Sequence, residues 1–370
     1  MKFMKKVLIF LLIVFLGFSC KKESSSFLWE KSFGPGNAYY ISSSPDSGIV
    51  ACGKESGNPF LLKLSKEKTS VMEYASERNG LFNRAWYDTS VFIAAGSSNG
   101  DMYLAAINKN GRKLWDTIIS AGFNIDFTRL CYSGSGSFIA VGTARADSSV
   151  NSTTGLLFLQ FDTTGHILMR KDVTSTGFIS AGDPALDASG NLYIPVTRGN
   201  TGLKTRASLL KYNVDLNKLW ETDLYNNPNF SSSANDAISD DAGNIYVCGK
   251  TEVTGSSGTL DNSFAASLRS AGSITWKKYL EDSNSGSAML INNSNILMTL
   301  SRDCFIIDKT RYDEAKDSVN SEGQIRWFTV CDPYNTDAFG SSFDIDPEGN
   351  IIAAGSMAGK FYLAVKSSSQ

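Results

Sequence analysis

Short apolar segments recur along this chain, and polar turns rich in Gly, Asn, Asp and Ser separate them. The stretch from Leu219 to Trp276 contains one complete unit of this pattern. Its parts are a strand around Trp220, a strand ending in the turn 240–244, the strands 245–249 and 264–268, and the tight turn Ala271-Gly272. Apolar runs bounded by such turns predict antiparallel β-strands joined by hairpins. The unit is therefore predicted to be one four-stranded sheet.

The same order of signals repeats through the chain. Each repeat ends in a strand with a Trp or Met anchor, and successive anchors are about 43 to 56 residues apart, a spacing typical of propeller blades. The anchors are Trp29, Met72, Trp115, Met169, Trp220, Trp276 and Trp327. An apolar third strand also recurs seven times, at 60–64, 102–107, 156–161, 208–212, 264–268, 305–308 and 361–365. We expect an all-β fold, a single seven-bladed β-propeller of four-stranded blades over residues 27–370.

The two ends of the chain complement each other. The last third strand, 361–365, has no Trp strand after it, and the first Trp strand, 27–33, has no third strand before it. The N-terminal strand is therefore expected to complete the last blade and close the ring, which shields edge strands from aggregation.

A small residue followed by Gly ends the second strand of most repeats. The pairs are Cys52-Gly53, Ala95-Gly96, Val141-Gly142, Cys248-Gly249 and Ala354-Gly355. Close packing between neighbouring blades is the expected reason for small side chains at this position.

Two turn-plus-Trp segments, 110–115 and 270–276, carry a family resemblance. They resemble the repeats of quinoprotein-like β-propellers, which carry the PQQ-type motif. The resemblance implies that the Trp residues dock neighbouring blades. It does not imply quinone binding, because the vicinal disulfide common in quinone-binding members needs a Cys-Cys pair and this chain has none.

The first 19 residues differ from the rest. Lys2, Lys5 and Lys6 precede an apolar run that is too short to span a bilayer, which predicts a signal peptide over 1–19. The segment 16–20 ends in Cys20 and resembles the lipobox of bacterial lipoproteins, which implies lipidation of Cys20 and a tether over 20–26. The alternative is cleavage nearby without lipidation. The expected location is the bacterial cell envelope, at the outer membrane or cell surface, with lipid anchoring.

The balance of charge excludes one class of partner. The chain has 35 Lys and Arg against 37 Asp and Glu, and removing the signal peptide removes three of the lysines. No run of basic residues follows, so we expect no nucleic-acid partner, since phosphate binding needs clustered positive charge.

Residues suited to catalysis are scarce. His166 is the only His, and it follows a hairpin turn, where an exposed turn residue is expected. Asp183 and Asp236 precede the predicted first strands of two blades, and Asp126 and Asp337 occupy related places. A ring of such carboxylates at the channel mouth could hold Ca²⁺. The alternative is that these side chains cap turns, and no other metal or cofactor is expected.

Five Cys remain after Cys20. Cys52 and Cys248 occupy a position that other repeats fill with Ala or Val, so we expect buried thiols. If the hairpin register of the other blades holds in the sixth, Cys304 lies opposite Cys331, and an exported protein permits a disulfide there. The alternative is that both remain free thiols.

The variable loops carry many aromatic residues and the inserts 144–155, 198–206 and 250–261. Because loops of this kind usually hold the function, we expect a non-enzymatic binding or scaffold propeller for an envelope protein. The first alternative is binding of a glycan or small ligand through the loop aromatics. A hydrolase or lyase that uses carboxylates at the channel mouth is the less favoured alternative.

Overall fold

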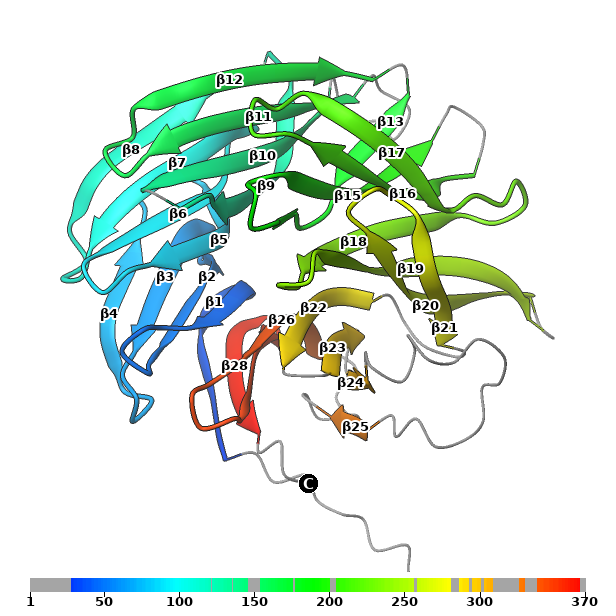
Figure 1. The fold of residues 1–370 in the computed structure, drawn as a ribbon. Helices are drawn as coiled ribbons and strands as arrows, with labels where there is room; N and C mark the ends of the chain where they lie inside the picture. Colours follow the sequence, from blue (N-terminus) through cyan, green and yellow to red (C-terminus); the bar gives the residue numbers. More distant parts are fainter. Residues whose placement is uncertain are drawn as a thin grey trace, which may run out of the picture.

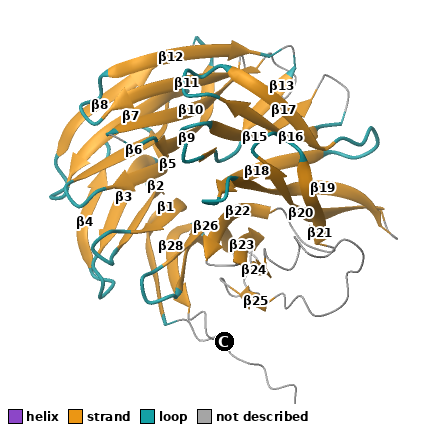
Figure 2. Ribbon diagram, in the orientation of Figure 1, coloured by secondary structure: helices purple, strands orange, loops and turns teal. Residues whose placement is uncertain are grey.

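The computed structural model describes residues 28–120, 122–134, 136–145, 154–175, 177–199, 204–255, 258–280, 286–292, 295–300, 303–308, 326–329 and 338–366. In these residues the secondary structure consists of antiparallel strands joined by turns (Figure 2). None of them forms an apolar helix long enough to cross a bilayer. The sheets are arranged radially around a common axis, which is the β-propeller predicted from the repeats (Figure 1).

Most sheets contain four consecutive strands, ordered from the axis outward. The second sheet along the chain is β5 (Gly80–Tyr87), β6 (Val91–Ser98), β7 (Asp101–Asn108) and β8 (Lys113–Ile119). The next is β9 (Asn124–Tyr132), β10 (Ser137–Arg145), β11 (Thr154–Asp162) and β12 (Ile167–Thr174). Two more four-stranded sheets come later in the chain. One consists of β18 (Ser232–Ser239), β19 (Asn244–Gly255), β20 (Gly258–Arg269) and β21 (Ile274–Leu280). The other consists of β22 (Gly286–Asn292), β23 (Asn295–Leu300), β24 (Asp303–Asp308) and β25 (Arg326–Thr329).

One sheet has an interrupted inner strand. It consists of β13 (Phe178–Ala181), β14 (Ala185–Leu186), β15 (Leu192–Gly199), β16 (Arg206–Tyr212) and β17 (Lys218–Tyr225). Both β13 and β14 pair with β15, and residues 182–184 lie between them.

The remaining sheet joins the two ends of the chain. Its order is β26 (Ala338–Ile345), β27 (Ile351–Met357), β28 (Lys360–Lys366), β1 (Trp29–Ser43), β2 (Ile49–Glu55), β3 (Asn58–Leu64) and β4 (Ser70–Ala75). The first part of β1, from Trp29 to Pro35, pairs with β28, and the second part, from Gly36 to Ser43, pairs with β2. The predicted pairing of the N-terminal strand with the last third strand is confirmed.

The core lies between neighbouring sheets. One buried cluster combines Ile93 and Leu104 of one sheet with Phe138, Leu157 and Phe161 of the next. Alternating side chains of each middle strand face the two neighbours, so the second and third strands are apolar on both faces. Apolar burial of this kind supplies about 25 cal/mol for each Å² removed from water.

Trp anchors dock one sheet on the next, as the family resemblance implied. The indole N–H of Trp115 donates to the carbonyl oxygen of Thr163 at 2.9 Å, and that of Trp220 donates to Ser270 at 3.2 Å. Both acceptors lie in a hairpin turn of the following sheet. In both hairpins the Trp pairs with the residue nine positions earlier, Trp115 with Ala106 and Trp276 with Ser267.

Candidate functional site: an axial pocket built by bulged strands

The innermost strands contain β-bulges at one level of the propeller. In β1 the register shifts between Ala38 and Tyr40, and in β5 it shifts between Phe82 and Arg84. Equivalent shifts occur between 234 and 236 in β18, 286 and 288 in β22, and 340 and 342 in β26. A bulge adds one residue to one strand of a pair and redirects side chains. The extra residues with described side chains are Tyr39, Asn83, Asn235 and Ser341.

The bulges explain why several second strands have a Gly opposite the inner strand. Gly96 pairs with Phe82 immediately before a bulge, and a Cβ on Gly96 would lie 1.9 Å from the carbonyl oxygen of Leu81. Gly249 is in the same situation, 2.0 Å from the carbonyl oxygen of Ser233. Small residues such as Ala95 do pack against the neighbouring sheet as expected, and a Cβ on Gly142 would meet Met102 of the adjacent sheet at 2.8 Å, but packing between blades is not what requires Gly at positions 96 and 249. The Gly admits the bulged backbone of its own sheet.

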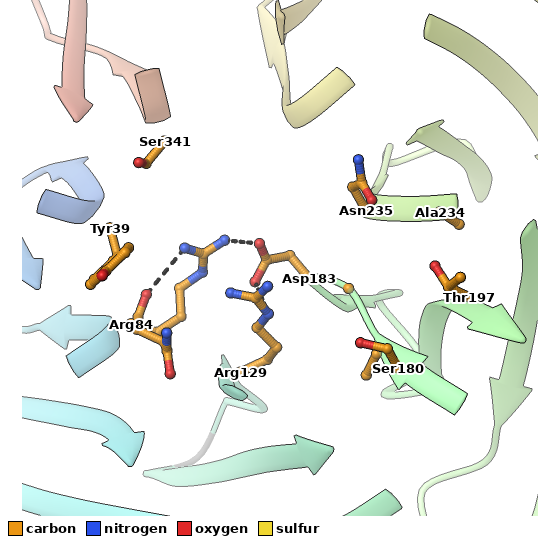
Figure 3. A pocket seen from close by; sticks show the side chains of 12 residues that line it. Tyr39, Arg84, Arg129, Ser180, Asp183, Thr197, Ala234, Asn235 and Ser341 are labelled. Atoms are coloured by element: carbon orange, nitrogen blue, oxygen red, sulfur yellow. Dashed lines mark hydrogen bonds and ion pairs between the residues drawn. The ribbon is translucent and has the colours of Figure 1, made fainter. Parts of the chain in front are cut away.

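The bulged residues converge on the axis. Tyr39, Asn83, Asn235 and Ser341 line a cavity of about 260 Å³. Figure 3 shows Tyr39, Asn235 and Ser341 around the pair Arg84 and Arg129 and the carboxylate of Asp183. The other lining residues are Ser180, Ala181, Gly182, Thr197 and Ala234. The charged residues that line the cavity are two cations and one anion.

Two guanidinium groups meet one carboxylate at the centre of the pocket. Arg84 Nη2 forms an ion pair with Asp183 Oδ2, and Arg129 Nε lies 3.2 Å from Asp183 Oδ1. The three side chains come from three different sheets, and each is less than one-fifth exposed. Opposite charges in such a poorly hydrated place interact more strongly than at the surface. The carboxylate therefore holds both guanidinium groups near the axis.

Burial and neighbouring charged groups shift the pKa values of these two arginines. Burial alone lowers the pKa of Arg84, but Asp183, Tyr40 and Asp236 outweigh it and raise the pKa above its usual value. Burial lowers the pKa of Arg129, and Asp183 opposes this effect. The Arg84 guanidinium also lies over the Tyr40 ring, 4.6 Å from its centroid, which fixes its position.

Asp183 and Asp236 do not precede the first strands of their blades as predicted, because Asp183 follows β13 and Asp236 lies within β18; the two form an isolated parallel bridge. The Asp183 N–H donates to Asn235 O at 2.8 Å, and the Ala237 N–H donates to Asp183 O at 2.9 Å. Asp183 occupies the break between β13 and β14, where other sheets have a bulge. Both aspartates are less than 9% exposed. Only Asp183 lines the pocket.

Of the carboxylates predicted to form a ring, Asp183 lines the pocket, and it forms ion pairs with two arginines. Within the described residues, no group of three or more His, Cys, Asp or Glu side chains is placed to hold a metal ion. Asp337 lies outside these residues, and the side chain of Asp126 is not described. Calcium binding here therefore stays a prediction without a supporting contact.

Several other predicted residues lie away from the pocket. His166 is an exposed turn residue, as expected, and its N–H donates to Asp162. Cys52 and Cys248 are fully buried free thiols, as expected. The expectation that the hairpin register of the other blades holds in the sixth is wrong, because in the β24–β25 pair Cys304 lies opposite Phe328. Cys20 and Cys331 lie outside the described residues, so lipidation and the Cys304–Cys331 disulfide stay predictions.

The two arginines and the bulged residues Asn83, Asn235 and Ser341 were not singled out by the sequence, whereas Tyr39 was among the loop aromatics. A signal for part of the set does exist. The Gly of the recurring small-residue–Gly pair lies within the second strand and pairs with the residue before a bulge, so aligning the repeats on that Gly locates Tyr39, Asn83, Asn235 and Ser341.

Comparison with known proteins identifies the fold. No protein-family model matches this chain, and no curated protein matches it. An ulvan lyase structure, bound to a GlcA(1-4)Rha3S unit, matches with a TM-score of 0.55 at 9% identity, over 91% of this chain and 94% of that one. An oligogalacturonate lyase from Vibrio parahaemolyticus matches with a TM-score of 0.54 at 10% identity, over 92% and 97%. The CNH domain of AfRom2 has the same TM-score and identity, over 92% and 98%. At these identities the likeness establishes a β-propeller fold.

Proposed function

We propose that this chain is a non-catalytic binding propeller that holds an anionic sugar, or a similar small acid, in the axial pocket. The observation that carries the proposal is the placing of Arg84 and Arg129 side by side, with one carboxylate between them. Guanidinium groups bind carboxylates and sulfates in two-point contacts. Around them lie hydroxyl and amide groups of Tyr39, Asn83 and Asn235, which suit the hydroxyls of a sugar.

The architecture that we propose for the chain is a ring of seven blades. Division of the seven-stranded sheet inside β1 gives one blade of β26, β27, β28 and the first part of β1, and another of the second part of β1 with β2, β3 and β4. The remaining five sheets supply one blade each. The Trp repeats then belong to the quinoprotein-like type, used here for docking between blades.

Binding is favoured over catalysis by the groups in the pocket. The described lining residues contain no His or Lys, and the carboxylate of Asp183 is engaged by two guanidinium groups. A general base needs a free proton acceptor within hydrogen-bond reach of the substrate. The lyases with a similar fold suggest elimination from uronates as the alternative, so the test below includes it.

The proposed location follows from the N-terminal segment. We place the mature chain on the bacterial envelope, held by acyl chains on Cys20, with the propeller exported. A second candidate function, docking of an envelope protein, is favoured by the long hairpin of β19 and β20. These two strands pair without interruption as far as Gly255 and Gly258, well beyond the Cys248–Ala265 pair near the core.

A thermal-shift screen of the mature protein tests the binding proposal. The probes are glucuronate, galacturonate, a GlcA(1-4)Rha3S oligosaccharide and sulfate, with glucose as the neutral control. We expect stabilisation by at least one acidic sugar, since a ligand that binds only the folded state raises its stability. The shift is expected to vanish in the Arg84→Gln variant. Equal shifts with glucose, or shifts unchanged in Arg84→Gln, would contradict the assignment. Release of an unsaturated product during incubation would replace binding by lyase activity.

A further inference from the structure

Exposed apolar side chains are concentrated at one edge of the propeller. Of the eleven large hydrophobic residues that are exposed in the described part of the chain, eight lie in the hairpin before an outer strand or at the start of that strand. They are Leu28, Val71, Leu114, Ile167, Leu168, Val214, Leu219 and Ile274. Five of them directly precede an anchor residue, so five of the seven repeats have an exposed apolar side chain at the equivalent position. Singly scattered exposed apolar residues need no explanation, but a repeated set at one edge does.

These hairpins form a continuous edge because each contacts the preceding sheet. A Cβ on Gly111 would lie 3.5 Å from the Met72 side chain, and one on Gly165 would lie 2.9 Å from the Trp115 ring. Lys171 Nζ donates to Leu216 O at 2.6 Å in the hairpin after its sheet. We call this edge the outer-hairpin rim, made of Leu28 and residues 65–71, 109–114, 163–168, 214–219 and 270–274.

The rim also carries exposed positive charge. Its basic residues include Lys66, Lys109, Arg112 and Lys113, which are exposed, against the acidic Glu67 and Asp215. The hairpins nearer the axis are instead acidic, with Asp187, Asp240 and Asp346 held in their own turns. Apolar side chains beside Lys and Arg suit the boundary between acyl chains and anionic head groups.

The chain enters the propeller at this rim. Leu28 precedes the part of β1 that pairs with β28, and its N–H donates to Val365 O at 2.8 Å. Seven residues, 21–27, separate it from the proposed lipidated Cys20, so eight residue steps join Cys20 to Leu28. At about 3.6 Å for each extended residue they span at most about 29 Å. A tether this short, attached at the rim, keeps the rim near the bilayer surface.

We propose that the outer-hairpin rim docks on the surface of the bilayer that holds the acyl chains, with the exposed Leu and Val side chains at the head-group boundary. The propeller axis is then perpendicular to the membrane plane. The face that carries the hairpins points toward the lipid, and the loops of the opposite face point toward solvent. This inference rests on the proposed anchoring at Cys20. Each exposed Leu that enters the head-group boundary buries apolar surface, and this adds to the free energy of membrane binding that the acyl chains supply.

The test uses the full lipidated protein in vesicles of phosphatidylethanolamine and phosphatidylglycerol. Nitroxide labels are placed on Leu114→Cys and Leu219→Cys in the rim, and on Phe123→Cys and Tyr279→Cys as matched controls. All four residues are exposed hydrophobics, and the controls lie at the opposite ends of the blades. Collision rates with oxygen, which concentrates in lipid, and with a water-soluble nickel complex are compared. Circular dichroism confirms the fold of each variant.

On vesicles we expect the ratio of oxygen to nickel collisions to rise severalfold at the two rim labels and to stay unchanged at the control labels. Equal ratios at all four labels, in protein that floats with the vesicles, would overturn the rim inference and leave the anchoring intact. Protein that fails to float with the vesicles would overturn the anchoring and the rim inference together. A higher ratio at the control labels would reverse the proposed orientation.

Discussion

The indole N–H of Trp115 donates to the carbonyl oxygen of Thr163, 2.9 Å away, and so ties the outer strand of one blade to a hairpin of the next. Gly165 in that hairpin has φ of +83° and lies against the indole face. The neighbouring Leu114 has no such partner and is 54% exposed. The Trp therefore connects blades, whereas the adjacent Leu faces outward.

Replacing Trp115 by Ala is predicted to lower the free energy of unfolding by about 2 to 4 kcal/mol, because packing between two blades and a hydrogen bond are lost. The matched change Leu114→Ala is predicted to alter it by less than about 0.5 kcal/mol. Urea unfolding followed by circular dichroism measures both. Equal losses in the two variants would contradict the docking role of the Trp.

Gly96→Ala is predicted to lower the free energy of unfolding by about 2 to 4 kcal/mol, since a Cβ would lie 1.9 Å from Leu81 O and would disrupt the bulge at Asn83. The control is Gly199→Ala, whose nearest neighbour is the Thr205 side chain at 3.2 Å. That side chain can move, so the control is expected to cost less than about 1 kcal/mol. Unfolding curves for both proteins decide the question, and a control as damaging as Gly96→Ala would refute the bulge argument.

Alkaline pH is predicted to destabilise the protein partly through Tyr40. Burial raises the pKa of Tyr40 to about 12, against the opposing charge of Arg84. Below the unfolded pKa of about 10 the phenol is neutral in both states, and its contribution is fully present. Between about pH 10 and 12 only the unfolded state ionises, so stability falls as the pH rises. We expect Tyr40→Phe to reduce the slope of stability against pH over this window, measured by urea unfolding. A slope unchanged by the substitution would contradict this prediction.

Cysteine reactivity provides an independent prediction. Burial raises the pKa of the Cys131 thiol to about 12 and the pKa values of Cys52 and Cys248 above their usual value. Because the thiolate is the reactive form, all three are expected to alkylate at least tenfold more slowly than unfolded protein at pH 8. Mass spectrometry after timed iodoacetamide treatment measures this. The same samples without reductant report on Cys304 and Cys331, whose disulfide predicts no labelling of either.

The repeat pattern was sufficient to predict the strands, the docking Trp residues and the pairing of β1 with β28, since these depend on local turns and on period. It also drew attention to Asp183 and Asp236, but it placed them before the first strands of their blades, whereas Asp183 follows β13 and Asp236 lies within β18. It did not show that Asp183 meets Arg84 and Arg129. Those residues come from separate blades, and which of them share the axis depends on the bulge register and on closure of the ring. Neither the bulge register nor the closure of the ring can be predicted from the residues of one strand.

The most direct test of the account is isothermal titration of glucuronate oligosaccharide into the mature protein and into its Arg129→Gln and Asn83→Ala variants. The account predicts saturable binding with one site for each chain, at least tenfold weaker in Arg129→Gln, and weakened by added salt because the contact is ionic. Asn83→Ala is predicted to weaken binding less, because it removes a neutral contact. Binding that is equally strong in Arg129→Gln, or equally strong for a neutral oligosaccharide, would contradict the assignment of the axial pocket.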